Sequence, residues 1–134
     1  MNFGAHVCFG SVAGAGFMFL AQKNGISPEP VAFMLSCTLG SVLPDIDHPK
    51  SYIGRRVPLI PKLLYKTVGH RTLTHSILFT LLASMLLYKL NHAAGIGLWA
   101  GITSHIVLDI CTPFSKGVSL FYPITRKRIG IFKK

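Results

Sequence analysis

The chain has 134 residues, of which 50% are hydrophobic and only 13% are charged, and fourteen Lys and Arg outnumber four acids to give a net charge of +10. The charged fraction is about half that of an average soluble domain, which excludes an ordinary soluble protein, and the high hydrophobicity excludes a disordered one. The three cysteines, Cys8, Cys37 and Cys111, lie in apolar contexts without CxxC spacing, which excludes a disulfide framework and a cysteine zinc finger.

The first two apolar stretches cover residues 5–21 and 31–43. No positively charged segment precedes the first, so we interpret it as a membrane-spanning helix and not as a signal peptide. A spanning helix needs about 20 residues and tolerates about 17, and the second stretch is shorter. Ser27 and Pro28 favour a helix start before it. We expect this second helix to span fully; the alternative is a helix that enters the bilayer partway.

A long connection over residues 44–72 begins PDIDHP and holds four prolines. Loops of this length inside a compact protein are usually functional. The segment VPLIPKLLYKTV within it predicts a short amphipathic helix at the membrane interface. On this helix, the side chains expected toward lipid are Leu59, Leu63, Leu64 and Val68, and those expected toward water are Lys62 and Lys66.

Two further apolar stretches, residues 73–90 and 93–112, are each long enough to cross a bilayer. The pattern predicts an all-α integral membrane protein with about four transmembrane helices, forming one membrane-embedded domain over residues 1–134. Six Lys and Arg lie between the second and third stretches, six follow the fourth, and only Lys23 and Lys89 remain. The positive-inside rule therefore predicts that the long connection, the C-terminal tail and both termini are cytoplasmic.

The basic tail also allows other readings. Membrane anchoring is the simplest one, and a nucleic-acid partner would draw on the same charges. No aromatic-interleaved RNA motif or helix-turn-helix pattern accompanies them, so we expect no nucleic acid. The chain shows no sign of an obligate protein partner either.

The predicted topology gathers most of the rare ionisable residues at one end of the bundle. These are His6, Asp45, Asp47, His70, His75, His105 and Asp109, whereas Glu29 and His92 fall at the other end. His48 lies within reach of the cluster, either as a participant or as an ordinary loop residue. Any one of these side chains alone is commonly a core histidine or a helix end. Together they indicate a functional site, because ionisable groups inside a membrane bundle are costly.

Residue spacing predicts how the cluster forms. His105 and Asp109 are four apart and share one helical face, which Gly97 and Gly101 continue. A matching stripe of His6, Gly10 and Gly14 predicts that the first and last helices touch along their glycines. Asp45 and Asp47 can aim at one centre only from an extended or turned segment. His70 and His75, five apart, do not share a helical face, so we expect His70 on the preceding loop.

The donor types indicate a metal site. Imidazole and carboxylate without thiolate suit zinc, with manganese or iron as alternatives. Seven candidates exceed the three or four ligands that one zinc takes, so two or more ions are expected. No nucleophile elbow or kinase-type phosphate loop offers a different chemistry.

Five blocks in this order resemble the YdjM-like family, which comprises inner-membrane proteins described as LexA-regulated, membrane-bound, predicted metal-dependent hydrolases. The blocks are His6, GSVLPDIDH at 40–48, GHRTLTHS at 69–76, GITSHIVLD at 101–109, and TPF with GVSLFYP at 112–123. The similarity extends over nearly the whole chain. It implies a likeness to the all-helical zinc phospholipase C and P1-nuclease group, whose ions sit in a His/Asp cluster and cleave phosphoesters. It also implies that the seven residues are metal ligands or their close neighbours, and that Arg71 faces the phosphate.

We therefore predict a metal-dependent hydrolase of the bacterial inner membrane that acts on a phosphoester, in a lipid headgroup, at the cytoplasmic interface. Asp45 or Asp47 would be the general base, and Arg71 would neutralise developing charge. The first alternative is a non-enzymatic metal transporter or sensor, whose ligands are expected near the middle of the bilayer. The second is a structural or regulatory membrane protein with a vestigial site.

Overall fold

The computed structural model describes residues 3–113 and 116–131, and within these ranges all regular secondary structure is helical except for one isolated β-bridge between Val118 and Ile129. The all-α prediction is thereby confirmed. Lys133 and Lys134, which were counted with the basic tail, lie outside the described residues. The elements in chain order are α1 Phe3–Lys23, α2 Pro30–Gly40, η1 Leu43–Asp47, α3 Leu59–Thr67, η2 Leu73–His75, α4 Ile77–Leu90 and α5 His92–Cys111.

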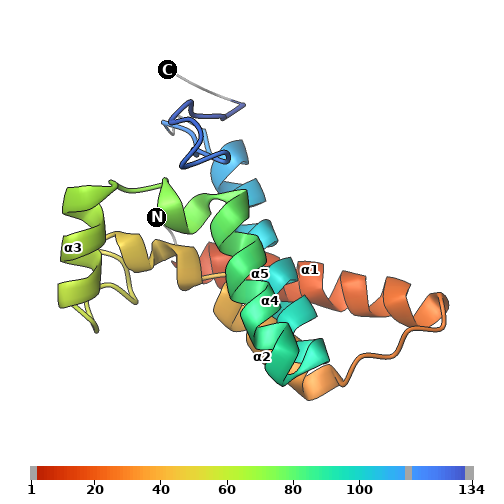
Figure 1. The fold of residues 1–134 in the computed structure, drawn as a ribbon. Coiled ribbons are helices and arrows are strands. Elements are labelled where there is room, and N and C mark those ends of the chain that lie inside the picture. The colour runs from red at the N-terminus through yellow and green to blue at the C-terminus, as the bar shows by residue number, and fades with distance from the viewer. Residues whose placement is uncertain (1–2, 114–115, 132–134) are drawn as a thin grey trace.

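The helices form two hairpins. The α4–α5 turn is a single residue, Asn91, whose side-chain oxygen accepts a hydrogen bond from Ala94 N–H at 2.9 Å and so caps α5. The α1–α2 turn is longer, and α2 begins at Pro30 under a cap from the Glu29 carboxylate, which accepts from the next two free N–H groups. The predicted start at Ser27 and Pro28 was therefore wrong, because a carboxylate that satisfies two amides is the better cap. In Figure 1 α2 lies beside α5, α1 diverges from them toward its C-terminal end, and α3 stands apart from the other helices.

The short helix α2 lies at the centre of the packing. Gly97 and Gly101 of α5 lie so close to α2 that an added Cβ would overlap the carbonyl oxygens of Phe33 and Cys37. Gly10 and Gly14 of α1 face α2 as well, against Ser41 and Cys37 respectively. The predicted glycine-to-glycine contact between the first and last helices was therefore wrong.

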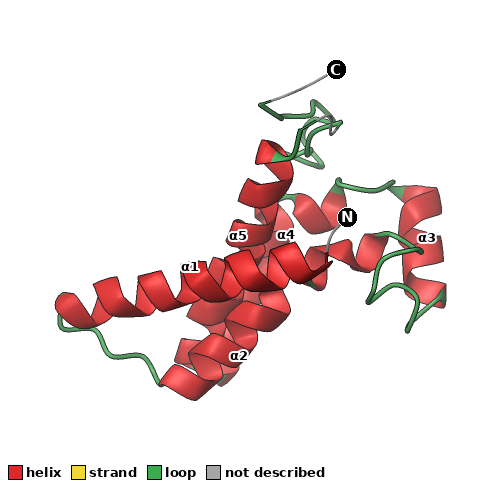
Figure 2. Ribbon diagram, turned by 180° about the vertical axis from the view of Figure 1, so that it is seen from behind, coloured by secondary structure: helices red, strands yellow, loops and turns green. Residues whose placement is uncertain are grey.

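Small side chains explain why α2 takes this central place. Ser36, Cys37 and Ser41 let the backbones on both sides approach closely, and a larger helix face would hold them apart. The first helix still crosses over α5 near its own N-terminal end, as Figure 2 shows from behind.

Helix lengths set which segments can cross a membrane. The described residues include two helices that are long and apolar enough, α1 with 21 residues and α5 with 20, and α4 is a shorter apolar helix. The 11 residues of α2 rise roughly 16 Å, about half the thickness of the hydrocarbon core. A full span over residues 31–43 is not confirmed. The chain turns instead into η1, which carries Asp45 and Asp47 into the bundle.

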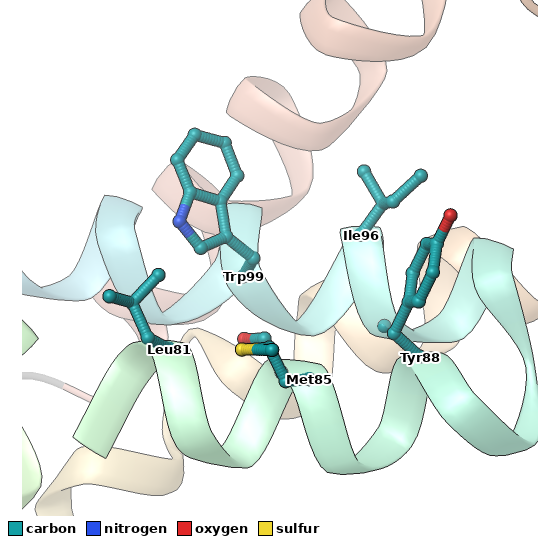
Figure 3. A pocket seen from close by; sticks show the side chains of 7 residues that line it. Leu81, Met85, Tyr88, Ile96 and Trp99 are labelled. Carbon is teal, nitrogen blue, oxygen red and sulfur yellow. The ribbon is translucent and has the colours of Figure 1, made fainter. Parts of the chain in front are cut away.

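The outer surface of the α4–α5 hairpin is apolar. Leu82 and Met85 are 60% exposed and Leu86 is 70% exposed. Figure 3 shows a shallow pocket of about 170 Å³ between the two helices, where Met85 and Trp99 lie among other apolar side chains. Such a surface suits hydrocarbon better than water. The predicted amphipathic helix also forms, as α3, with Leu59 and Leu63 exposed, while Leu64 and Val68 are partly buried.

Candidate metal centre

Five buried side chains from four elements bring their ligand atoms together. One group consists of His6, His105 and Asp109, and a second consists of Asp45, His75 and His105; within each, the candidate ligand atoms lie within 4.8 Å of one another. His105 belongs to both groups. None of the five is more than 6% exposed. The structure therefore places the expected helix ends next to each other and gives two adjoining candidate positions for an ion.

His105 is fixed at the centre by a single hydrogen bond. Its Nδ1 lies 2.6 Å from the carbonyl oxygen of Ser41, and because a carbonyl can only accept, Nδ1 carries the proton. The other ring nitrogen, Nε2, lies 3.4 Å from Asp45 Oδ1 and 3.3 Å from His75 Nε2. The His6 ring stacks on His105 with centroids 3.9 Å apart. Ser41 follows α2 directly, so the position of α2 determines the orientation of the His105 ring.

Asp47 stands behind the cluster and not within it. Its Oδ1 accepts from His70 Nδ1 at 2.7 Å, and its Oδ2 accepts from Arg71 N–H at 3.0 Å and Thr74 Oγ1 at 2.8 Å. His75 Nδ1 lies 3.3 Å from the same Oδ2. Both oxygens are thus engaged by protein donors. This position suits a carboxylate that orients His70 and His75, and Asp47 belongs to neither of the candidate ligand groups among the described residues.

The protonation of this region follows from its ion pairs. Burial by itself raises the pKa of Asp47, but hydrogen bonds with His70 and His75 outweigh burial and hold it well below its usual range. Burial by itself lowers the pKa of His75, but the carboxylates of Asp109 and Asp47 outweigh burial and raise it to about 9. His75 therefore carries a proton at neutral pH when no cation is bound. A bound cation would replace that proton among the carboxylates.

Two buried polar atoms test whether a metal fits. Asp45 Oδ1 and His6 Nδ1 are buried and make no hydrogen bond to any residue in the described ranges. A buried polar atom without a partner costs about 1–3 kcal/mol. Asp45 Oδ1 also lies 3.4 Å from His105 Nε2. A cation bound between these two atoms would satisfy Asp45 Oδ1, and the nitrogen and oxygen donors suit zinc, manganese or iron.

Arg71 connects Asp109 of the ligand cluster with Asp47 behind it. Its guanidinium donates to Asp109 Oδ1 at 2.7 Å, while its own backbone N–H reaches Asp47. Its φ of 61° lies in the left-handed region, which strains a non-glycine residue by about 1–3 kcal/mol. These bonds hold it there. The side chain also lines the cavity in front of the cluster, where a phosphate-facing charge was expected.

The C-terminal segment closes over this turn. Ser119 N–H donates to Arg71 O at 3.0 Å, Arg128 donates to His70 O at 3.2 Å, and Ile77 N–H donates to Leu120 O at 2.9 Å. The tail was interpreted as a membrane anchor, and the structure gives part of it a second role in supporting the site. Residue types alone did not single out Ser119, Arg128 or the Ser41 carbonyl. The apolar residues of GVSLFYP were the available sign that this segment packs, and Val118 among them is fully buried in the structure.

A cavity of about 460 Å³ opens beside the cluster. Asp45, His70 and Arg71 form one wall, and the rest is lined by Phe3, His48, Lys50, Ser51, Tyr52 and Arg55. His48 lies beside His70, with ring centroids 4.7 Å apart, and its Nδ1 accepts from Lys50 N–H at 3.2 Å. Burial, followed by the charge of His70, lowers its pKa. Glu29 and His92 line a different pocket, away from this one.

Comparison with known proteins gives relatives but no solved structure. The family described as "YdjM inner membrane protein" matches residues 1–133. The "Uncharacterized protein YvsG" of Bacillus subtilis (strain 168) is 37% identical over 109 residues, which cover 79% of this chain and 67% of that protein. The "Inner membrane protein YdjM" of Escherichia coli (strain K12) and that of Shigella flexneri are each 42% identical over 95 residues, or 66% of this chain. That match covers 47% of their length, so the chain spans about half of these two relatives. No solved structure matches.

Proposed function

The chain belongs to the YdjM inner membrane protein family, and from this premise we propose that it is a membrane-bound, metal-dependent hydrolase that cleaves a phosphoester in a lipid headgroup. The observation that carries the proposal is the pair of buried ligand groups that share His105 and contain the unpartnered Asp45 Oδ1 and His6 Nδ1. A site used only for stability would not leave such atoms unsatisfied next to an open cavity. A phosphoester as the bond that is cleaved fits the two His/Asp ligand groups and the arginine beside them, and it follows the likeness to the zinc phospholipase C and P1-nuclease group that the sequence motifs imply.

The residues divide into distinct tasks. Because His105 offers only Nε2, it would ligate one ion, either with His6 and Asp109 or with Asp45 and His75, and the remaining residues would contribute to a second ion. Asp47 orients His70 and His75 from behind. When bound, divalent ions lower the pKa of a water and polarise a phosphoryl oxygen.

Asp45 is the better general base of the two predicted carboxylates, since it lines the cavity, whereas both oxygens of Asp47 accept hydrogen bonds from the protein. One Asp45 oxygen would face the ion and the other would accept the proton. Arg71, at the same wall, contributes positive charge toward the phosphoryl group. Its bond to Asp109 fixes the direction of the guanidinium.

We further propose that the site faces the cytoplasm. Twelve of the fourteen Lys and Arg lie in the long connection and the tail, whereas Lys23 and Lys89 lie near the opposite ends of the hairpins. The start of α1, the end of α2, the start of α4 and the end of α5 all carry or adjoin site residues. Four helices in the bilayer, with α2 inserted as the shortest, would keep this end at the headgroups.

The test begins with detergent-purified protein and elemental analysis of bound metal. The metal-loaded protein is then placed in anionic liposomes that contain a panel of phospholipids and isoprenoid phosphates, and phosphate or headgroup release is followed. We expect metal-dependent release that falls at least about 100-fold in Asp45→Asn and is unchanged in His92→Ala. If every lipid stays intact while metal is fully bound, the transporter or sensor alternative replaces the hydrolase.

A further inference from the structure

The cavity in front of the metal centre has more positive charge than the reacting phosphate requires. Its buried wall carries Asp45 and Arg71, 6% and 9% exposed, and its exposed rim carries Lys50 and Arg55. The volume of about 460 Å³ falls within the range of small-molecule sites. The space therefore accommodates a group larger than a single phosphate.

The charges of the wall and the rim are balanced differently. Arg71 is paired with Asp109, so much of its charge is already compensated. Over the described ranges, Lys50 and Arg55 form no ion pair, and the remaining acid, Glu29, caps α2 and lines a different pocket. Two cations at the mouth of a cavity, with no protein anion to meet them, favour an anionic ligand.

The rim is also built to hold these cations in place. The chain from His48 to Arg56 winds through successive turns, with Ser51 N–H donating to His48 O and Arg55 N–H donating to Ser51 O. Ser51 is buried, and its hydroxyl donates to the backbone carbonyl of Asp45 at 2.6 Å and accepts from Gly54 N–H at 2.9 Å. Gly54 packs so tightly that a Cβ would overlap His48 O. The turn that carries Lys50 and Arg55 is thus tied to the backbone of the proposed general base.

We propose that Lys50 and Arg55 form a second anion subsite, which binds a non-reacting phosphate while the reacting phosphate lies at the metal centre. The substrate class is then a lipid with two linked phosphates. This inference rests on the proposed function. In the reaction, a water oxygen bonds to the terminal phosphorus and the bond from that phosphorus to the bridging oxygen breaks. The products are inorganic phosphate and the lipid monophosphate, and the proton released by water passes through Asp45 to the solvent.

A charged contact to a non-reacting group helps catalysis by fixing the reacting group. Arginine is suited to this task because its planar fork binds two phosphate oxygens at once. Removing either rim cation should weaken use of the diphosphate by about tenfold, since a hydrogen bond to a charged group contributes about 1.5–3 kcal/mol.

The experiment compares two lipids with the same isoprenoid chain, one a diphosphate and the other a monophosphate, in liposomes with metal-loaded protein. We expect wild type to prefer the diphosphate by at least about tenfold in kcat/KM. Lys50→Ala and Arg55→Ala should each lower kcat/KM for the diphosphate about tenfold more than for the monophosphate, while metal content stays at the wild-type level. Arg56→Ala is the matched control, because Arg56 lies over the Tyr52 ring and does not line the cavity. Equal use of both lipids by wild type, or equal losses on both in the variants, overturns the subsite.

A binding measurement separates the subsite from the hydrolase. Titration calorimetry with inorganic diphosphate and inorganic phosphate needs no turnover. Tighter binding of diphosphate that is lost in Lys50→Ala and Arg55→Ala, without hydrolysis of any lipid, keeps the subsite and overturns the hydrolase. Lipid hydrolysis without discrimination between the two inorganic anions does the reverse.

Discussion

His105 is the residue on which both candidate ion positions depend. Its Nδ1 is committed to Ser41 O, and its Nε2 faces Asp45 and His75 on one side and Asp109 on the other. No other side chain belongs to both ligand groups found among the described residues. Metal content should therefore respond to this residue more strongly than to any single neighbour.

We expect His105→Ala to lose more bound metal than Asp45→Ala, because His105 belongs to both candidate ligand groups and Asp45 belongs to one. Elemental analysis of the purified variants gives the answer directly. His92→Ala lies outside both groups and should keep the wild-type content. Equal metal in His105→Ala and His92→Ala would show that the cluster does not bind the ions.

The protonation of His75 predicts opposite pH behaviour with and without metal. Its folded pKa of about 9 exceeds the ordinary 6.5, so its stabilising contribution to the metal-free protein is complete below 6.5 and is lost as pH rises through about 9. Asp47, with its pKa held low, contributes above its ordinary 3.8 and loses that contribution only as pH falls below it.

Thermal unfolding in detergent should therefore show the metal-free midpoint falling by several degrees between pH 6.5 and 9.5. Zinc affinity should rise over the same interval, because zinc and the proton compete for His75 Nε2. A metal-free midpoint that rises with pH would mean that His75 is neutral in the folded protein.

At the scale of helices, the approach of α2 to α5 determines the position of Ser41 and thus of His105. Gly101→Ala should lower the free energy of unfolding by about 1–3 kcal/mol, because the new Cβ overlaps the Cys37 carbonyl. It should also reduce metal content, although Gly101 is no ligand. Gly16→Ala is the matched control in α1, where a Cβ meets nothing within 4 Å. Thermal unfolding and elemental analysis of the two variants provide the comparison, and equal values for both would contradict the central role of α2.

The site residues were predictable because ionisable groups are rare in this chain and expensive in a membrane bundle. The distribution of Lys and Arg and the helical spacing were enough to predict that residues distant in sequence, such as His6 and Asp109, lie close in space. In the structure, His6 Nε2 lies 3.7 Å from Asp109 Oδ1. The helices were likewise predictable from hydropathy, within a few residues of each end.

The rest depended on contacts that no single stretch of sequence contains. The two glycine stripes predicted a close approach but not that α2 would be the partner. Asp47 has the same residue type as Asp45, and only its hydrogen bonds to His70 and Thr74 separate an orienting carboxylate from a ligand. Ser119 and Arg128 hold the His70–Arg71 turn by donating hydrogen bonds to its backbone carbonyls. Every residue has a backbone carbonyl, so the sequence does not show which ones make such contacts.

At the scale of the whole molecule, charge asymmetry predicts orientation in the membrane. Cysteines at exposed positions report it in intact cells with an impermeant thiol reagent. We expect Asn24→Cys, between α1 and α2, to be labelled, and Lys66→Cys on α3 to be protected until the cells are opened. Twelve positive charges on the α3 side give the physical reason. Labelling of Lys66→Cys from outside would contradict the cytoplasmic orientation and would place the candidate metal centre at the opposite face of the membrane.

The cluster also joins residues that are synthesised far apart in time. His6 leaves the ribosome early, and Asp109 follows roughly 100 residues later, which at about 5–20 residues per second is a delay of about 5 to 20 seconds. Ser119 and Arg128, which hold the His70–Arg71 turn, come later still. A nascent chain that ends before His105 contains neither ligand group, so the proposed ions would enter only after most of the helical bundle has been synthesised. Protein made during metal shortage would then be empty but complete over this bundle, and it would be loaded when metal returns.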